Sequence, residues 1–493
     1  MNYRMVIYTL GLVLLFESAF FLLPIITALV FGEWVQLCAF LATLAICAVI
    51  GSAAIYKKPK NMKLYTKEGF IIVSLSWVLL SLFGAIPFVL DGSIPNYIDA
   101  FFETVSGFTT TGSSIVPDVE ALPRAMLIWR SFTHWVGGMG VLVFVMAVLP
   151  LSGAKNMHIM KAESPGPQVS KLVPRVRKTA LILYAIYFCL TLVQFILLVF
   201  DMPVFDAICT AFGTAGTGGF GVKSDSLLGY SSYVQVVCTV FMLIFSINFN
   251  SYYLILKGKI KDALSSEVKL FLAIVFTAIT VITVSLYTSG DYEFTSLFDC
   301  IKHVAFTVAS IISTTGFATL DFNTWPIACT TVIVLLMFIG ACAGSTGGGI
   351  KVSRIILLGK GVSREMRTLI HPKQIRTVTV DRSPIEDGVL RSVSTYMTAY
   401  VMIFVASMLA LSFDPYVREI NTVIRGSTAF VTNFSAVTAT MNNIGPGLAL
   451  CGPCENFAFF SPISKLILSF DMLAGRLEIF PMLLLFSPGT WKK

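Results

Sequence analysis

Four short glycine-centred segments recur along the chain, and their backbone could bind a cation. Glycine reaches positive φ at low cost and lacks a Cβ, so neighbouring carbonyl groups can turn toward an ion. Four such segments around one axis would form a pore whose carbonyl oxygens replace the hydration shell of the ion. The segments are Thr110-Thr111-Gly112-Ser113, Gly218-Gly219-Phe220-Gly221, Thr314-Thr315-Gly316-Phe317 and Ile444-Gly445-Pro446-Gly447.

Long apolar runs flank each segment and must position it. Of the 493 residues, 56% are hydrophobic, which is typical of an integral membrane protein. Ten runs are long enough for helical spans, while the stretch before each glycine segment is too short to cross a bilayer. We therefore predict an all-α integral membrane protein with ten transmembrane helices and four re-entrant pore loops in a pseudo-tetrameric arrangement. The ten runs lie near residues 5–31, 35–56, 69–90, 125–150, 179–200, 232–256, 270–288, 327–350, 395–413 and 463–487.

The runs and glycine segments indicate an internal repeat of four units after two N-terminal helices. The first run holds Glu17 and lacks a small-residue cleavage site, so we expect a retained helix and not a secretion signal. The predicted divisions are 1–56 for the two N-terminal helices and 57–154, 155–256, 257–358 and 359–493 for the four repeats.

An aspartate opens the stretch before each of the first three glycine segments, at Asp99, Asp206 and Asp299. These carboxylates could cap the short helices that enter the membrane. They could also make an outer vestibule electronegative and raise the local cation concentration. The sequence leaves both interpretations open.

Other functional classes fit the pattern less well. A single glycine in a membrane helix usually packs or kinks it, but four at matching places in a repeat favour a pore. A secondary carrier of a small solute would show inverted repeats, whereas these units all enter from the same face. An intramembrane enzyme would need paired carboxylates, a metal cluster or an activated nucleophile, and we find none. The histidines, which show no metal-ligand spacing, are His134, His158, His303 and His371.

The basic residues predict the orientation, because Lys and Arg near span ends are held in the cytosol. The connectors 55–69, 155–178, 257–269 and 351–391, with the last two residues, hold 26 of the 35 Lys and Arg. Both termini are therefore predicted to be cytoplasmic. The net charge of +8 is explained by this topology and by contact with membrane lipid, and nothing favours nucleic-acid binding.

Cys451-Gly452-Pro453-Cys454 has the spacing of a thioredoxin-type motif, but no alternating strand and helix pattern surrounds it. A local disulfide on the outer face and a pair of unpaired thiols are the two interpretations that we keep.

On these residues the chain resembles the Trk/Ktr/HKT superfamily of cation transporters, most closely the bacterial TrkH-type potassium transport membrane subunit. The resemblance implies K⁺ uptake across the plasma membrane through a selective, gated, single-chain pore. Relatives that pass Na⁺ carry serine at the first filter glycine, whereas this chain has glycine in all four copies, so K⁺ is favoured over a less selective Na⁺/K⁺ pathway. The filter positions it implies are Thr110, Thr111, Gly112, Thr217, Gly218, Gly219, Thr314, Thr315, Gly316, Asn443, Ile444 and Gly445.

A glycine-rich run interrupts the apolar run at 327–350, and the resemblance makes it an intramembrane gate. Its glycines are too many for a stable helix, and Lys351 is not placed as a Walker motif requires. A kink for close packing is the alternative. The gate residues implied are Gly344, Ser345, Thr346, Gly347, Gly348 and Gly349.

Arg476 lies inside the last apolar run, where a charge is disfavoured and should face a cavity or a partner. Asp471 and Glu478 are nearby candidates for that partner. The resemblance places the arginine in the pore below the filter, where its charge would oppose a cation; snorkelling to the interface is the alternative.

The resemblance also implies a homodimer and a cytoplasmic nucleotide-binding regulatory subunit of the TrkA type. K⁺ is the transported ion, no organic cofactor is expected, and coupling to Na⁺ or H⁺ is left open.

Overall fold

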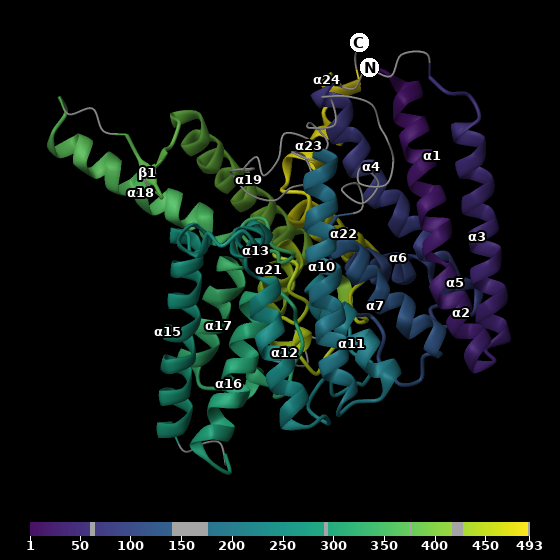
Figure 1. Cartoon of the computed structure of the whole chain (residues 1–493), viewed down its shortest axis with the longest axis horizontal. Helices are drawn as coiled ribbons and strands as arrows, with labels where there is room; N and C mark the ends of the chain where they lie inside the picture. Colours follow the sequence, from purple (N-terminus) through teal and green to yellow (C-terminus); the bar gives the residue numbers. More distant parts are fainter. Residues whose placement is uncertain are drawn as a thin grey trace.

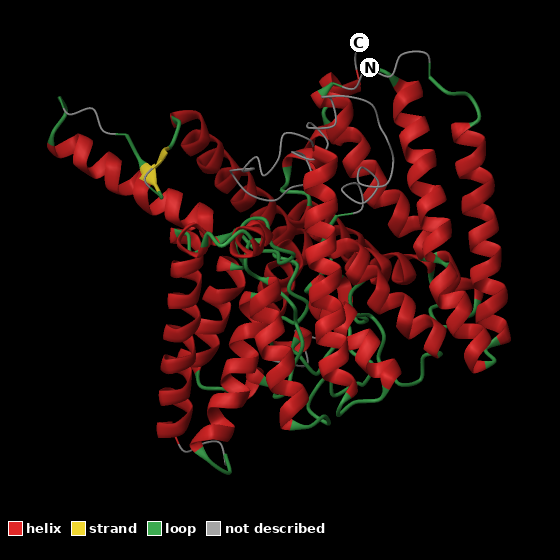
Figure 2. Cartoon of the chain, in the orientation of Figure 1, coloured by secondary structure: helices red, strands yellow, loops and turns green. Residues whose placement is uncertain are grey.

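The computed structural model describes residues 1–59, 65–140, 176–289, 294–373, 377–381, 383–416 and 427–491. These residues are mainly helical, as predicted, with one two-stranded hairpin that pairs Thr379 with Pro384 (Figures 1 and 2). The helices are α1 (Tyr3–Phe20), α2 (Leu22–Phe31), α3 (Trp34–Ile55), α4 (Thr66–Gly84), α5 (Ile86–Leu90), α6 (Tyr97–Phe108), α7 (Arg124–Gly138), α10 (Val176–Val199), α11 (Val204–Gly216), α12 (Ser232–Phe245), α13 (Phe249–Leu256), α14 (Ile260–Ala263), α15 (Ser266–Ser289), α16 (Leu297–Ile312), α17 (Ile327–Ile339), α18 (Val352–Ile370), α19 (Asp387–Leu411), α21 (Ser427–Met441), α22 (Pro462–Arg476), α23 (Phe480–Phe486) and α24 (Pro488–Trp491); short 3-10 turns η2 (Phe322–Thr324) and η3 (Ala449–Cys451) and strands β1 (Thr379–Val380) and β2 (Ser383–Pro384) complete the set.

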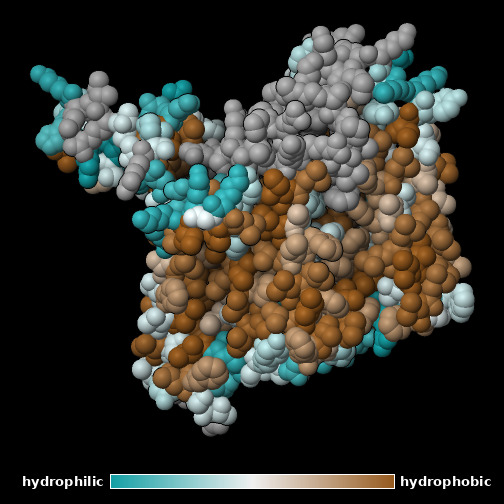
Figure 3. Space-filling view, in the orientation of Figure 1, coloured by the Kyte–Doolittle hydropathy of each residue, from teal (hydrophilic) through white to brown (hydrophobic). Residues whose placement is uncertain are grey.

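The surface carries a broad apolar band between two polar ends, as a membrane protein requires (Figure 3). Within the described ranges, six helices are long and apolar enough to cross a membrane, and a seventh span is possible if α12 and α13 are counted as one.

Several of the ten predicted runs are not continuous helices. The run at 232–256 bends by 90° between α12 and α13, and the run at 327–350 leaves helical geometry at Gly340, which has φ +69°. The run at 463–487 breaks between α22 and α23, where Glu478 and Ile479 both have positive φ. The run at 125–150 begins as α7, and its part beyond residue 140 lies outside the described residues. The repeat boundaries stay a prediction.

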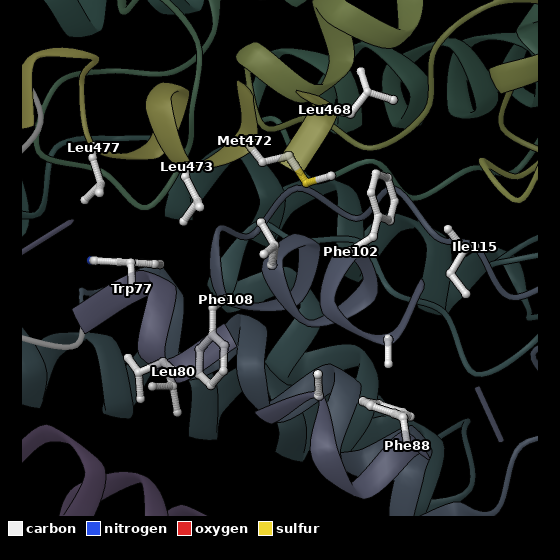
Figure 4. Packing of buried hydrophobic residues seen from close by; sticks show 14 of the residues in the cluster. Trp77, Leu80, Phe88, Phe102, Phe108, Ile115, Leu468, Met472, Leu473 and Leu477 are labelled. Carbon is white, nitrogen blue, oxygen red and sulfur yellow. The ribbon is translucent and has the colours of Figure 1, made fainter. Parts of the chain in front are cut away.

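Apolar packing fixes the helices around the centre of the molecule. Figure 4 shows buried side chains of α4, α6 and α22 gathered in one cluster, among them Trp77, Phe102 and Met472. At the N-terminus, α1 and α3 cross at Gly11 and Gly51, where an added Cβ on Gly51 would lie 2.9 Å from the Gly11 carbonyl oxygen. Small residues at such a crossing allow close backbone approach.

The two ends of the chain lie at the same end of the molecule, and the projecting helix α18 lies toward that end too (Figure 1). Most of the predicted basic connector at 155–178 lies outside the described residues, and the orientation of the termini stays a prediction.

The three opening aspartates do not cap their helices, so that interpretation was wrong. The N-cap positions are Asn96, Pro203 and Ser296, and each aspartate lies in the first turn. Sequence spacing alone does not distinguish the N-cap position from the first turn of the helix. Two of the three charges are also compensated, because Asp99 pairs with Lys465 at 2.7 Å and Asp299 pairs with Lys302 at 3.0 Å.

Candidate ion pathway

Four short helices, α6, α11, α16 and α21, end in the same backbone turn. The first residue of each filter triplet is left-handed, with φ between +53° and +60°. Its N–H donates to the carbonyl three residues earlier, and the next N–H donates to the carbonyl five residues before itself. This pattern is a helix C-terminal motif that normally favours glycine, and it recurs at Thr110, Thr217, Thr314 and Asn443.

The third residue of each triplet is a glycine with positive φ, and its missing Cβ admits the next segment. An added Cβ on Gly112 would lie 2.0 Å from the Gly218 carbonyl oxygen, and one on Gly219 would lie 2.0 Å from that of Thr315. A Cβ on Gly316 would lie 2.2 Å from the Ile444 carbonyl oxygen.

The last contact closes a ring, because a Cβ on Gly445 would lie 2.8 Å from the carbonyl oxygen of Thr111. Each glycine therefore abuts the middle residue of the next triplet, in the order one, two, three, four and back to one. We call these twelve residues the glycine ring. The structure thus brings together all the sequence-predicted filter residues around one centre.

The fourth triplet differs in sequence but keeps the geometry of the other three. The Asn443 side chain donates from Nδ2 to Thr111 Oγ1 at 3.0 Å and to the Met472 carbonyl oxygen at 2.9 Å. Ser113 Oγ donates to the Gly445 carbonyl oxygen at 3.0 Å. One hydrogen bond therefore joins the fourth triplet to the first, and a second joins it to Ser113, the residue that follows the first triplet.

Electrostatics at the ring favour a cation. Four helix C-termini converge there, each equivalent to about half a negative elementary charge. The segments that follow the four turns are non-helical, and in a membrane protein unpaired backbone groups are tolerated only against protein or a water-filled space. The arrangement can present backbone oxygens to an ion that has lost its water.

Two cavities lie against the ring. The outer cavity, about 130 Å³, is lined by all four ring glycines at the third positions and by Arg130. The inner cavity, about 100 Å³, is lined by Asn443, Arg476, Lys351 and the glycine-rich run. The predicted gate residues and the predicted filter thus border the same space.

The glycine-rich run is a non-helical loop packed directly against the ring. Gly348 N–H donates to Thr314 Oγ1 at 2.6 Å, and Gly349 N–H donates to the Asn442 carbonyl oxygen at 3.0 Å. An added Cβ on Gly348 would lie 2.2 Å from that Asn442 oxygen. The loop therefore packs closely and also borders the ring, so it has the features expected of both interpretations, the close-packing kink and the gate.

Arg476, the last residue of α22, joins this loop to the C-terminal end of α7. Its guanidinium donates to the Thr346 and Gly138 carbonyl oxygens, both at 2.8 Å, and to that of Gly137. These contacts hold the charge in the interior and do not match snorkelling. Of the two candidate partners, Glu478 forms an ion pair with Arg354, and Asp471 accepts from Ser407 Oγ at 2.8 Å.

Sequence reasoning missed several residues that hold this site together. His134, to which we assigned no chemistry, donates from Nδ1 to the Gly107 carbonyl oxygen at 2.7 Å and accepts at Nε2 from Phe220 N–H at 3.3 Å. Buried Lys351 contacts the Gly347 carbonyl oxygen. The signal available was a set of polar residues one helical turn apart within apolar runs.

The structure distinguishes the two interpretations of the Cys451–Cys454 motif. Cys451 is buried, Cys454 is exposed, and both are free thiols. The second interpretation of this motif, two unpaired thiols in a turn, is the correct one.

The apolar helices and the apolar surface band define a class, that of multi-pass membrane proteins. Residues 36–493 match the TrkH family, described as cation transport protein. The chain belongs to this family, whose members are transport proteins and not enzymes, as predicted.

Named relatives and a solved structure agree with this assignment. The chain is 35% identical to the Trk system potassium uptake protein TrkH of Salmonella typhimurium, with 100% of both chains covered. It is 34% identical to the Trk system potassium uptake protein TrkG of Escherichia coli, with 99% of both covered. The crystal structure of the potassium transporter TrkH from Vibrio parahaemolyticus superposes with a TM-score of 0.85 at 32% identity and covers 100% of both chains.

Proposed function

We propose that this chain takes up K⁺ across the plasma membrane through a gated pore that runs along the axis of the glycine ring. The observation that carries the proposal is the closed cycle of contacts, in which each ring glycine abuts the next triplet. Family membership and the names of the relatives, which are potassium uptake proteins, support K⁺ as the ion. An inside-negative potential of 100 mV would supply about 2.3 kcal/mol per K⁺ taken up.

In the proposed architecture, ten spans carry four re-entrant loops, and both termini are cytoplasmic. The four helices that end at the ring form the short inward limbs, and the broken runs account for spans that are not single helices. The grouping of both termini with projecting helix α18 supports the orientation (Figure 1). Carbonyl oxygens of Thr110–Gly112, Thr217–Gly219, Thr314–Gly316 and Asn443–Gly445 would coordinate the ion.

The glycine-rich loop and Arg476 are proposed to limit flux below the ring. Three carbonyl oxygens, from Thr346, Gly137 and Gly138, hold the arginine across the inner cavity. A fixed positive charge there raises the electrostatic free energy of a cation in a low-dielectric space. Opening would require the loop and the arginine to separate.

A homodimer and a nucleotide-binding regulatory subunit of the TrkA type are the proposed partners. The relatives are named as parts of a Trk system, which supports additional components. Helix α18 follows the gate loop directly, projects from the rest of the structure (Figure 1) and carries Arg367, which is exposed. A partner that moves α18 would therefore act on the loop.

Flux measurements on the purified chain test this proposal. Liposomes containing the chain, at an inside-negative potential, should take up K⁺ faster than Na⁺. Comparable K⁺ and Na⁺ uptake would indicate the less selective pathway. No cation flux with or without the regulatory subunit would reject the pore and favour a carrier of another solute.

A further inference from the structure

A buried ion pair lies behind the ring between the first two repeats. Glu103 of α6 and Arg130 of α7 meet at 2.8 Å, with side-chain exposures of 0% and 2%. Burying a charge pair carries a desolvation penalty that geometry and further hydrogen bonds must offset. Both residues make such hydrogen bonds, and these bonds reach the segment that follows ring residue Gly112.

The carboxylate of Glu103 holds the backbone that follows Gly112. It accepts from Ile115 N–H at 2.9 Å and from Ser114 Oγ at 3.0 Å. Arg130 donates from Nη2 to the same Ser114 Oγ at 3.1 Å. The pair therefore fixes the segment that returns from the ring in the first repeat.

The guanidinium of Arg130 also holds the second repeat. Its Cζ lies 4.1 Å from the centre of the Phe220 ring, and Phe220 directly follows ring residue Gly219. On the same face of α7, His134 lies 4.3 Å from that ring and accepts from Phe220 N–H. Arg130 and His134, four residues apart on α7, thus both contact Phe220. Arg130 is at the same time hydrogen-bonded to Ser114 of the first repeat.

The other returning segments in the described part of the chain are held differently. Ser310 Oγ donates to the Phe317 carbonyl oxygen at 2.5 Å in the third repeat. Ser435 Oγ donates to the Leu448 carbonyl oxygen at 3.0 Å in the fourth. His303 also contacts Thr319 Oγ1 in the third repeat at 3.0 Å. The segment after Gly112 differs from these two because a buried carboxylate and a buried guanidinium both contact it directly.

We infer that Glu103 and Arg130 are positioning residues that set the spacing between the first and second ring segments, and thereby the discrimination of K⁺ from Na⁺. The inference rests on the proposed function of the ring. The pair lies beside the outer cavity, which Arg130 lines together with Gly112 and Gly219. Within the described residues, the hydrogen bonds of the pair go to the segment that follows Gly112 and not to the gate loop. Loss of the pair should therefore alter selectivity and leave gating intact.

Two variants test the pair itself. Glu103→Gln keeps the size of the side chain but replaces one acceptor oxygen with a donor. Arg130→Lys keeps the charge but loses the planar fork that reaches both Glu103 and Ser114 while stacking on Phe220. In liposomes, each should lower the K⁺/Na⁺ flux ratio at least about fivefold, which corresponds to about 1 kcal/mol.

Asp99→Asn is the matched control, because Asp99 lies one turn from Glu103 on α6 and pairs with Lys465 of α22. Within the described residues, the Asp99 carboxylate pairs with Lys465 and not with the segment that follows Gly112. The K⁺/Na⁺ flux ratio of this variant should therefore stay within about twofold of that of the unmodified chain, the scatter of independent sites. Should the two charge variants fail to fold, Phe220→Leu removes the stacked ring and leaves both charges in place. It should also lower the ratio.

The outcomes separate this inference from the proposed function. An unmodified chain without K⁺ preference would refute the function of the ring. A selective unmodified chain with folded Glu103→Gln, Arg130→Lys and Phe220→Leu variants of equal selectivity would overturn the inference alone. A drop of the same size in Asp99→Asn would also overturn it, because any lost ion pair on α6 would then suffice.

Discussion

Alanine substitution of the four third-position glycines of the ring should lower K⁺ selectivity in an order set by how close the added Cβ lies to a carbonyl oxygen. An added Cβ would lie 2.0 Å from a carbonyl oxygen at Gly112 and Gly219, 2.2 Å at Gly316 and 2.8 Å at Gly445. Real Cβ contacts essentially never fall below 3.0 Å. The first two variants must therefore move a ring carbonyl by about 1 Å, whereas Gly445→Ala requires only a few tenths of an ångström.

Backbone strain is common to all four positions and needs its own control. The glycine at the third position of each triplet has positive φ. A non-glycine residue in that region costs roughly 1–2 kcal/mol. Gly32 also has positive φ, at +71°, but an added Cβ there would meet nothing within 4 Å. Gly32→Ala should lower stability by a similar amount and leave the K⁺/Na⁺ ratio unchanged.

The assay is the K⁺/Na⁺ flux ratio in liposomes, normalised to folded protein. We expect Gly112→Ala and Gly219→Ala to lose discrimination most, Gly316→Ala next and Gly445→Ala least. Equal ratios in all four variants, or Gly445→Ala as the most damaged, would refute the cyclic packing as the basis of selectivity.

Three further substitutions address the inner cavity and the fourth triplet. Arg476→Ala should raise cation flux, measured with Rb⁺ in liposomes, because it removes the charge held by Thr346; unchanged flux in folded protein would contradict this role. Gly348→Ala should raise leak, since its Cβ would lie 2.2 Å from a neighbouring carbonyl oxygen, and a tight variant would leave that loop a packing element. Asn443→Ala removes two buried hydrogen bonds, one to Thr111, and should lower the free energy of unfolding by about 1–3 kcal/mol, as a lower thermal midpoint would report.

The sequence allowed the ring residues to be predicted, because their glycine spacing reflects a local backbone requirement. The four triplets share one turn geometry, and this includes the fourth, which begins at Asn443 and differs in sequence from the others. The order of the ring could not be predicted, since contacts such as Gly445 with Thr111 join residues that are distant along the chain. The same holds for the contact of Gly348 with Asn442, which locates the loop against the ring.

Other expectations failed where one pattern permits two local structures. The opening aspartates lie in the first turn and not at the N-cap, because acidic residues are favourable at both places. The apolar runs at 327–350 and 463–487 were predicted to be continuous spans. They break at Gly340 and at Glu478–Ile479, where the backbone has positive φ. The Glu103–Arg130 pair was missed because the two residues lie on separate helices with no shared sequence motif.

Localising the ion tests the central claim most directly. Crystals of the chain grown in Rb⁺, a K⁺ analogue with a usable absorption edge, would show ions by anomalous scattering. The account predicts anomalous density on the axis of the glycine ring, within coordination distance of carbonyl oxygens from all four triplets. Density that occupies another cavity and leaves the ring empty at saturating Rb⁺ would contradict it.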